Sequence, residues 1–467
     1  MAKPSWVRDG AERVWNAICA APPWLVLGSG WLFLIVYAHP GLMTQDSYDH
    51  LREVREGIYT DSHPPAINVI WSVIEYVTAG PVGFLVLQAT CLIGGLYRVF
   101  RITFEPRRAA WFATGVFVFP PVMLPMAVIW KDCLMAGFLV VGVALLCSPR
   151  RGARIGGLVM MFLATAVRYN AFGATLPLIW FLFEWTPGWR WWKRYPLALA
   201  AWFAVTFAAF FLNARVTDHQ MHYWHSSLAL FDIAGTLANL DQDLPDDQLQ
   251  TLLAGTEIQA THDIHASFRA LYNPRSFLPL VWPDRYPPMW KVPINGYVPA
   301  PVAQRDAIER AWKQVLHDHP REYLVHRFVV FGHALGFSRE QSDAGIVGRR
   351  VMWPEFAGKL GIGLESSKLQ RKLTRPMVWL RDHTPIFTPW LYVVLSLILL
   401  PLGWRHRDVR ALLISGLVIE SSLLPLAQSP DYRYSHWMVI CTVISVIVLT
   451  ARRARNRENT DRVPPAP

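Results

Sequence analysis

The sequence predicts an all-α fold, a polytopic bundle of transmembrane helices with a mostly helical domain outside the membrane. Hydrophobic residues make up 53% of the chain and charged residues only 17%. The apolar residues gather in runs of about 20, the length that a helix needs to cross a bilayer. Arginine clusters and aromatic residues bound these runs and pin spanning helices at the two interfaces. One such aromatic belt is formed by Trp185, Trp189, Trp191 and Trp192.

Apolar length and flanking aromatic residues predict about ten spans. The first, residues 22–39, follows Lys3, Arg8 and Arg13, and no small-residue cleavage site comes after it. We therefore interpret it as an uncleaved signal anchor. The other expected spans are residues 82–100, 109–128, 133–148, 155–168, 171–186, 196–213, 387–403, 409–425 and 436–451.

The arginine clusters between the spans predict the orientation. With a cytoplasmic N-terminus, the clusters around Arg98, Arg150, Arg190 and Arg405 all fall on the cytoplasmic side, as the positive-inside rule requires. Counting residues 64–79 as a further span would move these clusters outside. That segment is short and contains polar residues, so we predict a helix on the outer interface that starts at its proline pair.

The spans divide the chain into four parts. Residues 1–213 form an N-terminal transmembrane module with a first outer loop at 40–81, and residues 387–451 form the C-terminal transmembrane helices. Residues 214–386 are hydrophilic and too long for a connecting loop, so we expect an outer domain. Helical spacing predicts two of its helices, at 306–316 and 322–333, and the second is apolar enough to lie on the bilayer. Residues 452–467 are expected to be a disordered cytoplasmic tail.

Charge and cysteine content argue against two other classes of protein. The net charge is +11, but the basic residues lie in short clusters between apolar spans and form no continuous basic domain. Orientation explains them better than nucleic-acid binding does. The five cysteines lie in or beside hydrophobic segments, and none falls in the long hydrophilic stretch. We therefore predict no disulfide.

Ionisable residues gather at the outer ends of the predicted spans. Charges beside apolar helices are costly to bury and usually mark a water-filled cavity or a bound polar group. Arg52 or Arg55 could instead extend to the interface, and Asp46 could be only a helix cap. The candidates that we single out are Asp46, Asp49, Arg52, His63, Lys131, Asp132, Arg168, Tyr432 and Arg433.

This mixture of residue types favours chemistry on a lipid phosphate. Arginine and lysine can hold a phosphate, and a nearby carboxylate can remove the proton of an incoming hydroxyl. Transfer of a sugar from a polyprenyl phosphate needs both functions, because the departing phosphate must be stabilised.

Asp46 lies in the first outer loop and is followed by His63-Pro-Pro. This order and several other motifs resemble those of the GT-C superfamily of integral membrane glycosyltransferases, in particular its protein mannosyltransferase and aminoarabinose transferase branch. The resemblance covers roughly the first 170 residues and the last outer loop. Family members often have two adjacent acids, whereas Ser47 and Tyr48 separate Asp46 from Asp49 here. The other similar segments are Phe119-Pro-Pro-Val, Ile129-Trp-Lys-Asp132, Arg168-Tyr-Asn-Ala and Pro430-Asp-Tyr-Arg-Tyr434.

The resemblance implies that Asp46 is the general base of an inverting transfer. If the loop is helical, Asp49 shares its face and could orient it. The donor phosphate is expected to bind Lys131, Arg168, Arg433 and Arg52. Supporting roles are expected for Asp49, His63, Asp132 and Tyr432.

No metal or other cofactor is expected to be required, since cations can replace the divalent ion that some GT-C enzymes use. A divalent metal ion stays an alternative. His219, His222 and His225 recur at intervals that suit zinc, but no fourth ligand lies nearby in the sequence, so we disfavour a zinc site there.

Together these features predict a multi-pass protein of the bacterial inner membrane with its active site facing the periplasm. It would bind the bilayer and no nucleic acid, and would transfer a sugar from undecaprenyl phosphate to a glycan, glycolipid or envelope polymer such as lipopolysaccharide. One alternative is a flippase or transporter of lipid-linked sugars, although such proteins often show repeated halves, which this sequence lacks. An O-antigen-type polymerase or ligase is chemically closer and is also kept.

Overall fold

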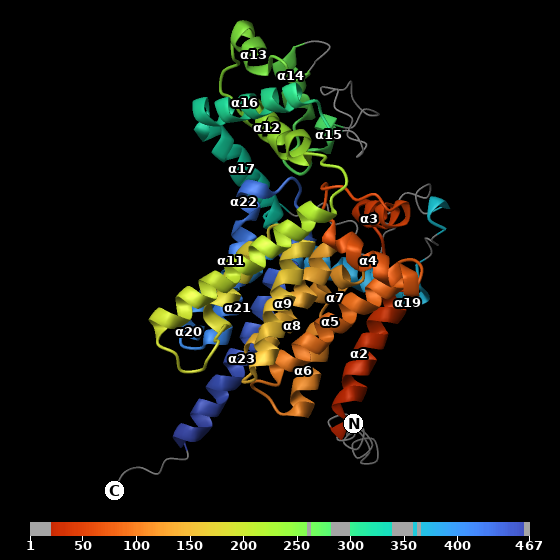
Figure 1. The fold of residues 1–467 in the computed structure, drawn as a ribbon, viewed down its shortest axis with the longest axis vertical. Coiled ribbons are helices and arrows are strands. Elements are labelled where there is room, and N and C mark those ends of the chain that lie inside the picture. The colour runs from red at the N-terminus through yellow and green to blue at the C-terminus, as the bar shows by residue number, and fades with distance from the viewer. Residues whose placement is uncertain (1–19, 259–262, 282–298, 339–357, 362–365, 462–467) are drawn as a thin grey trace, which may run out of the picture.

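The computed structural model describes residues 20–258, 263–281, 299–338, 358–361 and 366–461. Over these residues the predicted all-α fold class is confirmed, because helices follow one another and the only β pairing is two isolated bridges. Most helices form one long bundle, and a smaller group of helices lies at one end of it (Figure 1).

The bundle helices make the chain a multi-pass membrane protein. Among the described residues, four helical segments are long and apolar enough to cross a membrane. They are α5 (Val82–Phe100), α11 (Trp191–Val216), α21 (Arg407–Ser421) with α22 (Leu423–Leu426), and α23 (His436–Asp461).

Shorter helices occupy five more of the predicted spans. A helix of 16 residues covers ~24 Å, less than the ~30 Å of a typical hydrocarbon core, so length alone does not establish that each one crosses. The count of ten spans stays a prediction. These helices are α2 (Pro23–Ala38), α8 (Lys131–Leu146), α9 (Arg151–Val167), α10 (Ala171–Leu182) and α20 (Pro389–Gly403).

The predicted span at 109–128 is broken in the structure. Helices α6 (Pro106–Val118) and α7 (Pro120–Met126) meet at a bend of 68°. Pro120 explains the break, because proline disfavours helical geometry in the residue before it and lacks an N–H. Beyond α7, the Ile129 N–H donates to the Leu42 carbonyl at 2.8 Å. The bend therefore brings the start of α8 beside the first outer loop.

Two short helices of that loop lie at the same end of the bundle (Figure 1). They are α3 (Gln45–Glu56) and α4 (Ala66–Val77). Helix α4 starts directly after Pro65, as predicted, and its 12 residues span ~18 Å, too short to cross a bilayer.

The helices α12 to α17, which we call the cap domain, have a hydrophobic core of their own that includes Phe231, Phe268 and Val330. Leu423 and Ala427 from the bundle join this core, so the cap domain packs against α22. Both helices predicted in this region are present, as parts of α16 and α17. The bounds are α12 (Leu230–Ala238), α13 (Asp246–Leu253), α14 (Ile264–Leu271), α15 (Leu278–Val281), α16 (Val302–Asp318) and α17 (Pro320–Ala334); the short π-helix η1 (His225–Ala229) precedes them.

The tail predicted to be disordered from residue 452 is helical up to Asp461, because α23 continues to that residue. Arg452 pairs with Asp408 at 2.5 Å, and Arg455 donates to the Thr103 carbonyl at 2.6 Å. These contacts hold the extra turns against the bundle after the apolar pattern ends. Residues 462–467 lie outside the described part of the chain.

Candidate active site

Asp46 lies in the first turn of α3, and its carboxylate does not cap the helix. Thr44 is the N-cap residue, and its N–H donates to the Ser47 hydroxyl at 3.2 Å. Ser47 in turn donates to the Ile129 carbonyl at 2.5 Å, which ties the start of α3 to the loop before α8. The helix-cap interpretation of Asp46 is therefore wrong, and its charge is available to other groups.

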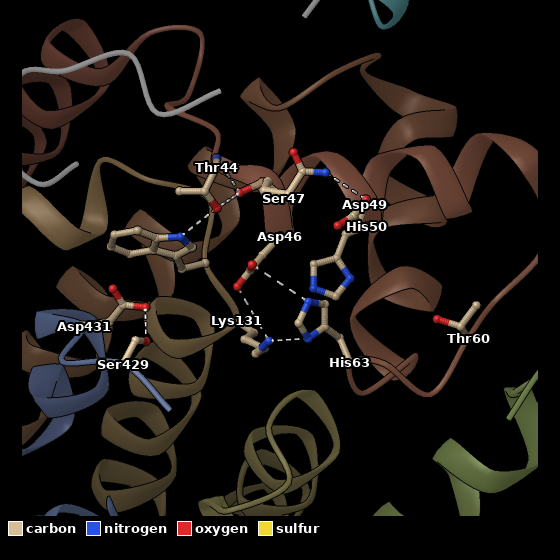
Figure 2. Close-up of polar contacts among 12 residues, drawn as sticks. Thr44, Asp46, Ser47, Asp49, His50, Thr60, His63, Lys131, Ser429 and Asp431 are labelled. Carbon is tan, nitrogen blue, oxygen red and sulfur yellow. Dashed lines mark hydrogen bonds and ion pairs between the residues drawn. The ribbon is translucent and has the colours of Figure 1, made fainter. Parts of the chain in front are cut away.

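Three basic side chains from distant parts of the sequence surround the Asp46 carboxylate. Arg433, in the short helix η4 (Tyr432–Ser435), contacts it at 2.7 Å. Lys131 Nζ lies at 3.9 Å and His63 Nε2 at 4.0 Å, and these two side chains contact each other at 2.8 Å. Figure 2 shows Asp46, Lys131 and His63 pointing toward one another. The structure thus brings together four of the residues predicted to form the site.

The electrostatics keep Asp46 ionised and His63 neutral. Burial alone would raise the pKa of Asp46, but the charges of Arg433 and Lys131 hold it well below its usual range. Burial, with the charge of Lys131, lowers the pKa of His63 well below its ordinary value. Neutral His63 can accept a hydrogen bond from Lys131 through Nδ1, which leaves the proton on Nε2, facing Asp46.

Arg433 is held firmly in place by groups on several sides. Its guanidinium contacts Asp431 at 3.1 Å and lies 4.9 Å from the centre of the Trp130 ring. Trp130 is itself fixed, because its indole N–H donates to the Thr44 hydroxyl at 3.0 Å. An arginine between two carboxylates and an aromatic face is already oriented for an anionic ligand.

Asp132 and Arg168 form a second ion pair near Arg433. The two side chains contact each other at 2.5 Å, and only 1% of the Asp132 side chain is exposed. Arg168 also donates to Asn170 at 2.9 Å, and it lies 5.0 Å from the ring of Tyr434, which Arg433 approaches from 5.2 Å. Arg168 therefore lies near Arg433 but already has a carboxylate partner. Its expected contact with the donor phosphate stays a prediction.

The remaining candidates lie at the edge of the group. Arg52 is directed along α3, where it pairs with Asp49 at 3.3 Å and Glu56 at 4.0 Å. The loop is helical at this point, so Asp46 and Asp49 lie on the same face of α3. Asp49 also accepts a hydrogen bond from Gln45. Tyr432 is buried against the ring of Phe387. The roles proposed for these residues stay predictions.

Sequence reasoning missed a buried polar network that joins α3 to α4. The His50 ring contacts Asn68 at 2.7 Å, and Asn68 donates to Glu53 at 2.6 Å. Thr60 donates to the other oxygen of Glu53 at 2.7 Å. The ring of His50 lies 5.0 Å from that of His63, so this network backs the site. The spacing of His50, four residues after Asp46 on one helix, was the signal that could have identified it.

No group of three metal-ligating side chains is arranged around a common point in the part of the chain that the structure describes. In the histidine triplet, the rings of His222 and His225 lie 6.1 Å apart, edge to face.

The chain has little detectable similarity to known proteins. No protein-family profile matches the chain, and no curated protein does. Among solved structures, the crystal structure of ArnT from Cupriavidus metallidurans bound to undecaprenyl phosphate is similar at 13% sequence identity. The match covers 94% of this chain and 80% of that one, with a TM-score of 0.34. A likeness this low carries no functional conclusion, so the function follows from the geometry of the site.

Proposed function

We propose that the protein is a GT-C-type membrane glycosyltransferase that moves a sugar from a polyprenyl phosphate to a hydroxyl acceptor with inversion. The observation that carries this proposal is the contact of one carboxylate, Asp46, with the cations Arg433 and Lys131 at the end of a membrane bundle. A base and a phosphate-binding cradle in one place are the two functions that the reaction needs.

In the proposed reaction, Asp46 accepts the proton of the acceptor hydroxyl as its oxygen attacks the anomeric carbon of the sugar. The bond between that carbon and the phosphate oxygen breaks, and its electron pair stays on the phosphate. Arg433 and Lys131 stabilise the charge of the departing polyprenyl phosphate. Their cationic cradle serves the leaving group without requiring a metal ion.

Donor binding and base activation are coupled in this scheme. Arg433 contacts Asp46 directly in the structure, and this contact contributes to the low pKa of the carboxyl. When a phosphate binds the Arg433 guanidinium, the ion pair between Arg433 and Asp46 weakens. The pKa of Asp46 then rises, and the carboxylate becomes a stronger base. The donor must therefore bind before Asp46 can act efficiently.

We further propose an undecaprenyl-phosphate sugar as donor and a glycan, glycolipid or envelope polymer as acceptor. The protein is proposed to lie in the bacterial inner membrane with this site on the periplasmic side. The arginine clusters of the short loops support that orientation.

The test uses the purified protein with short-chain polyprenyl-phosphate sugars and candidate acceptors. Asp46→Asn keeps the shape of the side chain and removes the base, so transfer should fall by about 10²- to 10⁴-fold. Glu105→Gln is the control, because Glu105 precedes α6, is more than half exposed, pairs with Arg108 outside the candidate site and should leave transfer unchanged. Full transfer by Asp46→Asn would remove this base from the mechanism.

A further inference from the structure

Helix α19 (Lys368–His383) packs against α2, at the end of that helix from which the first outer loop starts. Its N-cap, Ser367, donates to the carbonyl of Tyr37 at the end of α2. At its other end, the short helix η3 (Pro385–Phe387) leads directly into α20, which returns to the bundle. Figure 1 shows α19 beside α2 and below α3 and α4. These two connections hold α19 next to the end of α2 and the start of α20.

One face of α19 is covered and the opposite face is free. Leu369, Leu373 and Met377 on the covered face pack against the main hydrophobic core of the bundle. The free face has basic residues at i, i+3, i+4 and i+7, and Trp379, 56% exposed, follows one turn later on the same face. The basic residues of this face are Lys368, Arg371, Lys372 and Arg375, all exposed.

Neither helix stability nor pairing with the described residues explains these four cations. They fill the first two turns, where the helix dipole favours acids, and the first turn has no acid. Arg371 donates to the Ser366 carbonyl. Among the described residues, no acidic side chain forms an ion pair with Lys368, Lys372 or Arg375.

We propose that the basic face of α19 binds the phosphate head groups of anionic phospholipids in the adjacent leaflet. Four cations followed on the same face by a tryptophan, next to the ends of apolar helices, complement a layer of lipid phosphates. The basic face is the one that lipids beside the protein can contact, because the apolar face of the helix packs against the bundle. The chain before α19 contacts the first outer loop, since Arg55 donates to the Leu360 carbonyl. The proposal does not depend on the transfer reaction.

The test captures the lipids that neighbour α19 in the intact protein. The photoreactive residue benzoylphenylalanine replaces Trp379, and the protein is placed in nanodiscs with equal amounts of phosphatidylglycerol and phosphatidylcholine. After illumination, mass spectrometry identifies the attached lipid. We expect phosphatidylglycerol to be captured about fivefold more often, the enrichment that one cation in contact with an anionic head group gives.

Two variants and one control probe make the result specific. The combined change Lys368→Gln, Arg371→Gln, Lys372→Gln and Arg375→Gln should abolish the preference. The pair Arg371→Lys and Arg375→Lys should keep it, because the charge is retained. A probe in place of Trp191, which is exposed at the start of α11, should give the same lipid ratio in all variants. Equal capture of both lipids by the natural face, or a preference that survives the fourfold change, would overturn the proposal.

Discussion

Lys131 is a side chain whose position does not stabilise its own helix but does contribute to the candidate site. It occupies the first turn of α8, where a positive charge opposes the helix dipole. Its amino group instead contacts His63 at 2.8 Å and lies 3.9 Å from Asp46. A cation kept in this unfavourable position is well suited to bind an anion.

Lys131→Ala should therefore weaken binding of the donor phosphate more than binding of the acceptor. The loss expected for one hydrogen bond to a charged group is about tenfold or more in the dissociation constant. Binding of a short-chain polyprenyl phosphate and the KM for the acceptor measure the two effects. Lys193→Ala is the control, because that amino group stacks on Trp192 outside the site. Unchanged donor affinity in Lys131→Ala would contradict the assignment.

Asp49 offers a test of the electrostatics through pH. Burial, the largest effect, raises its pKa to about 6, above the ordinary value near 4. The folded protein therefore binds this proton more tightly than the unfolded chain, so ionisation of Asp49 costs stability as the pH rises from about 4 to 6. Asp49→Asn should raise the melting temperature at pH 7.5, and the gain should shrink toward pH 4. A gain of the same size at both pH values would contradict this environment.

At the scale of elements, the pair α3 and α4 depends on a few buried polar contacts. Asn68 joins the two helices by accepting from His50 and donating to Glu53. Burial lowers the pKa of His50 to about 3, so this ring is neutral and its hydrogen bonds depend on Asn68. The network holds the helix that presents Asp46.

Asn68→Ala should destabilise the protein by about 1–3 kcal/mol, because it leaves buried polar groups without partners. Thermal unfolding in detergent measures the effect. Ser72→Ala on the same helix is the control, since the Ser72 hydroxyl bonds only within α4 to the Val69 carbonyl. Equal melting temperatures for the two variants would show that the network does not support the helix pair.

Elements were predictable wherever a local pattern determines them. Apolar runs and the proline pair before α4 gave helices close to those observed. The break at Pro120 was visible as a motif, but its 68° bend depends on how α7 packs against the first outer loop. The basic face of α19 went unremarked because its meaning depends on which face the bundle covers.

At the scale of the whole molecule, the candidate site exists only because the chain folds back on itself. Asp46 and Arg433 contact each other although 387 positions separate them in the sequence. Residue types and loop sides predicted that such groups would meet. Distances and partners, such as the pairing of Arg168 with Asp132, required the packing of the complete bundle.

A buried arginine in the cap domain forms an ion pair inside that domain and a hydrogen bond to the bundle. Arg327 on α17 contacts Asp232 on α12 and donates to the Ala427 carbonyl at 2.8 Å, just before the loop that leads to Arg433. Arg327→Met removes the cation that pairs with buried Asp232 and leaves that carboxylate with His326 and Trp312, which should cost about 3–5 kcal/mol and lower the melting temperature. Arg321→Met on the same helix is the control, because that arginine is largely exposed. Equal melting temperatures would show that the ion pair does not stabilise the cap domain.

A double-mutant cycle on donor binding tests the central claim most directly, with polyprenyl phosphate as the ligand. If Asp46 and the phosphate compete for the same guanidinium, Asp46→Asn should tighten binding by about tenfold and Arg433→Gln should weaken it by a similar factor. The account predicts that Asp46→Asn tightens binding much less once Arg433 is replaced, because only Lys131 is then shared with the phosphate. Equal effects of Asp46→Asn with and without Arg433 would show that the carboxylate and the phosphate do not share this cation.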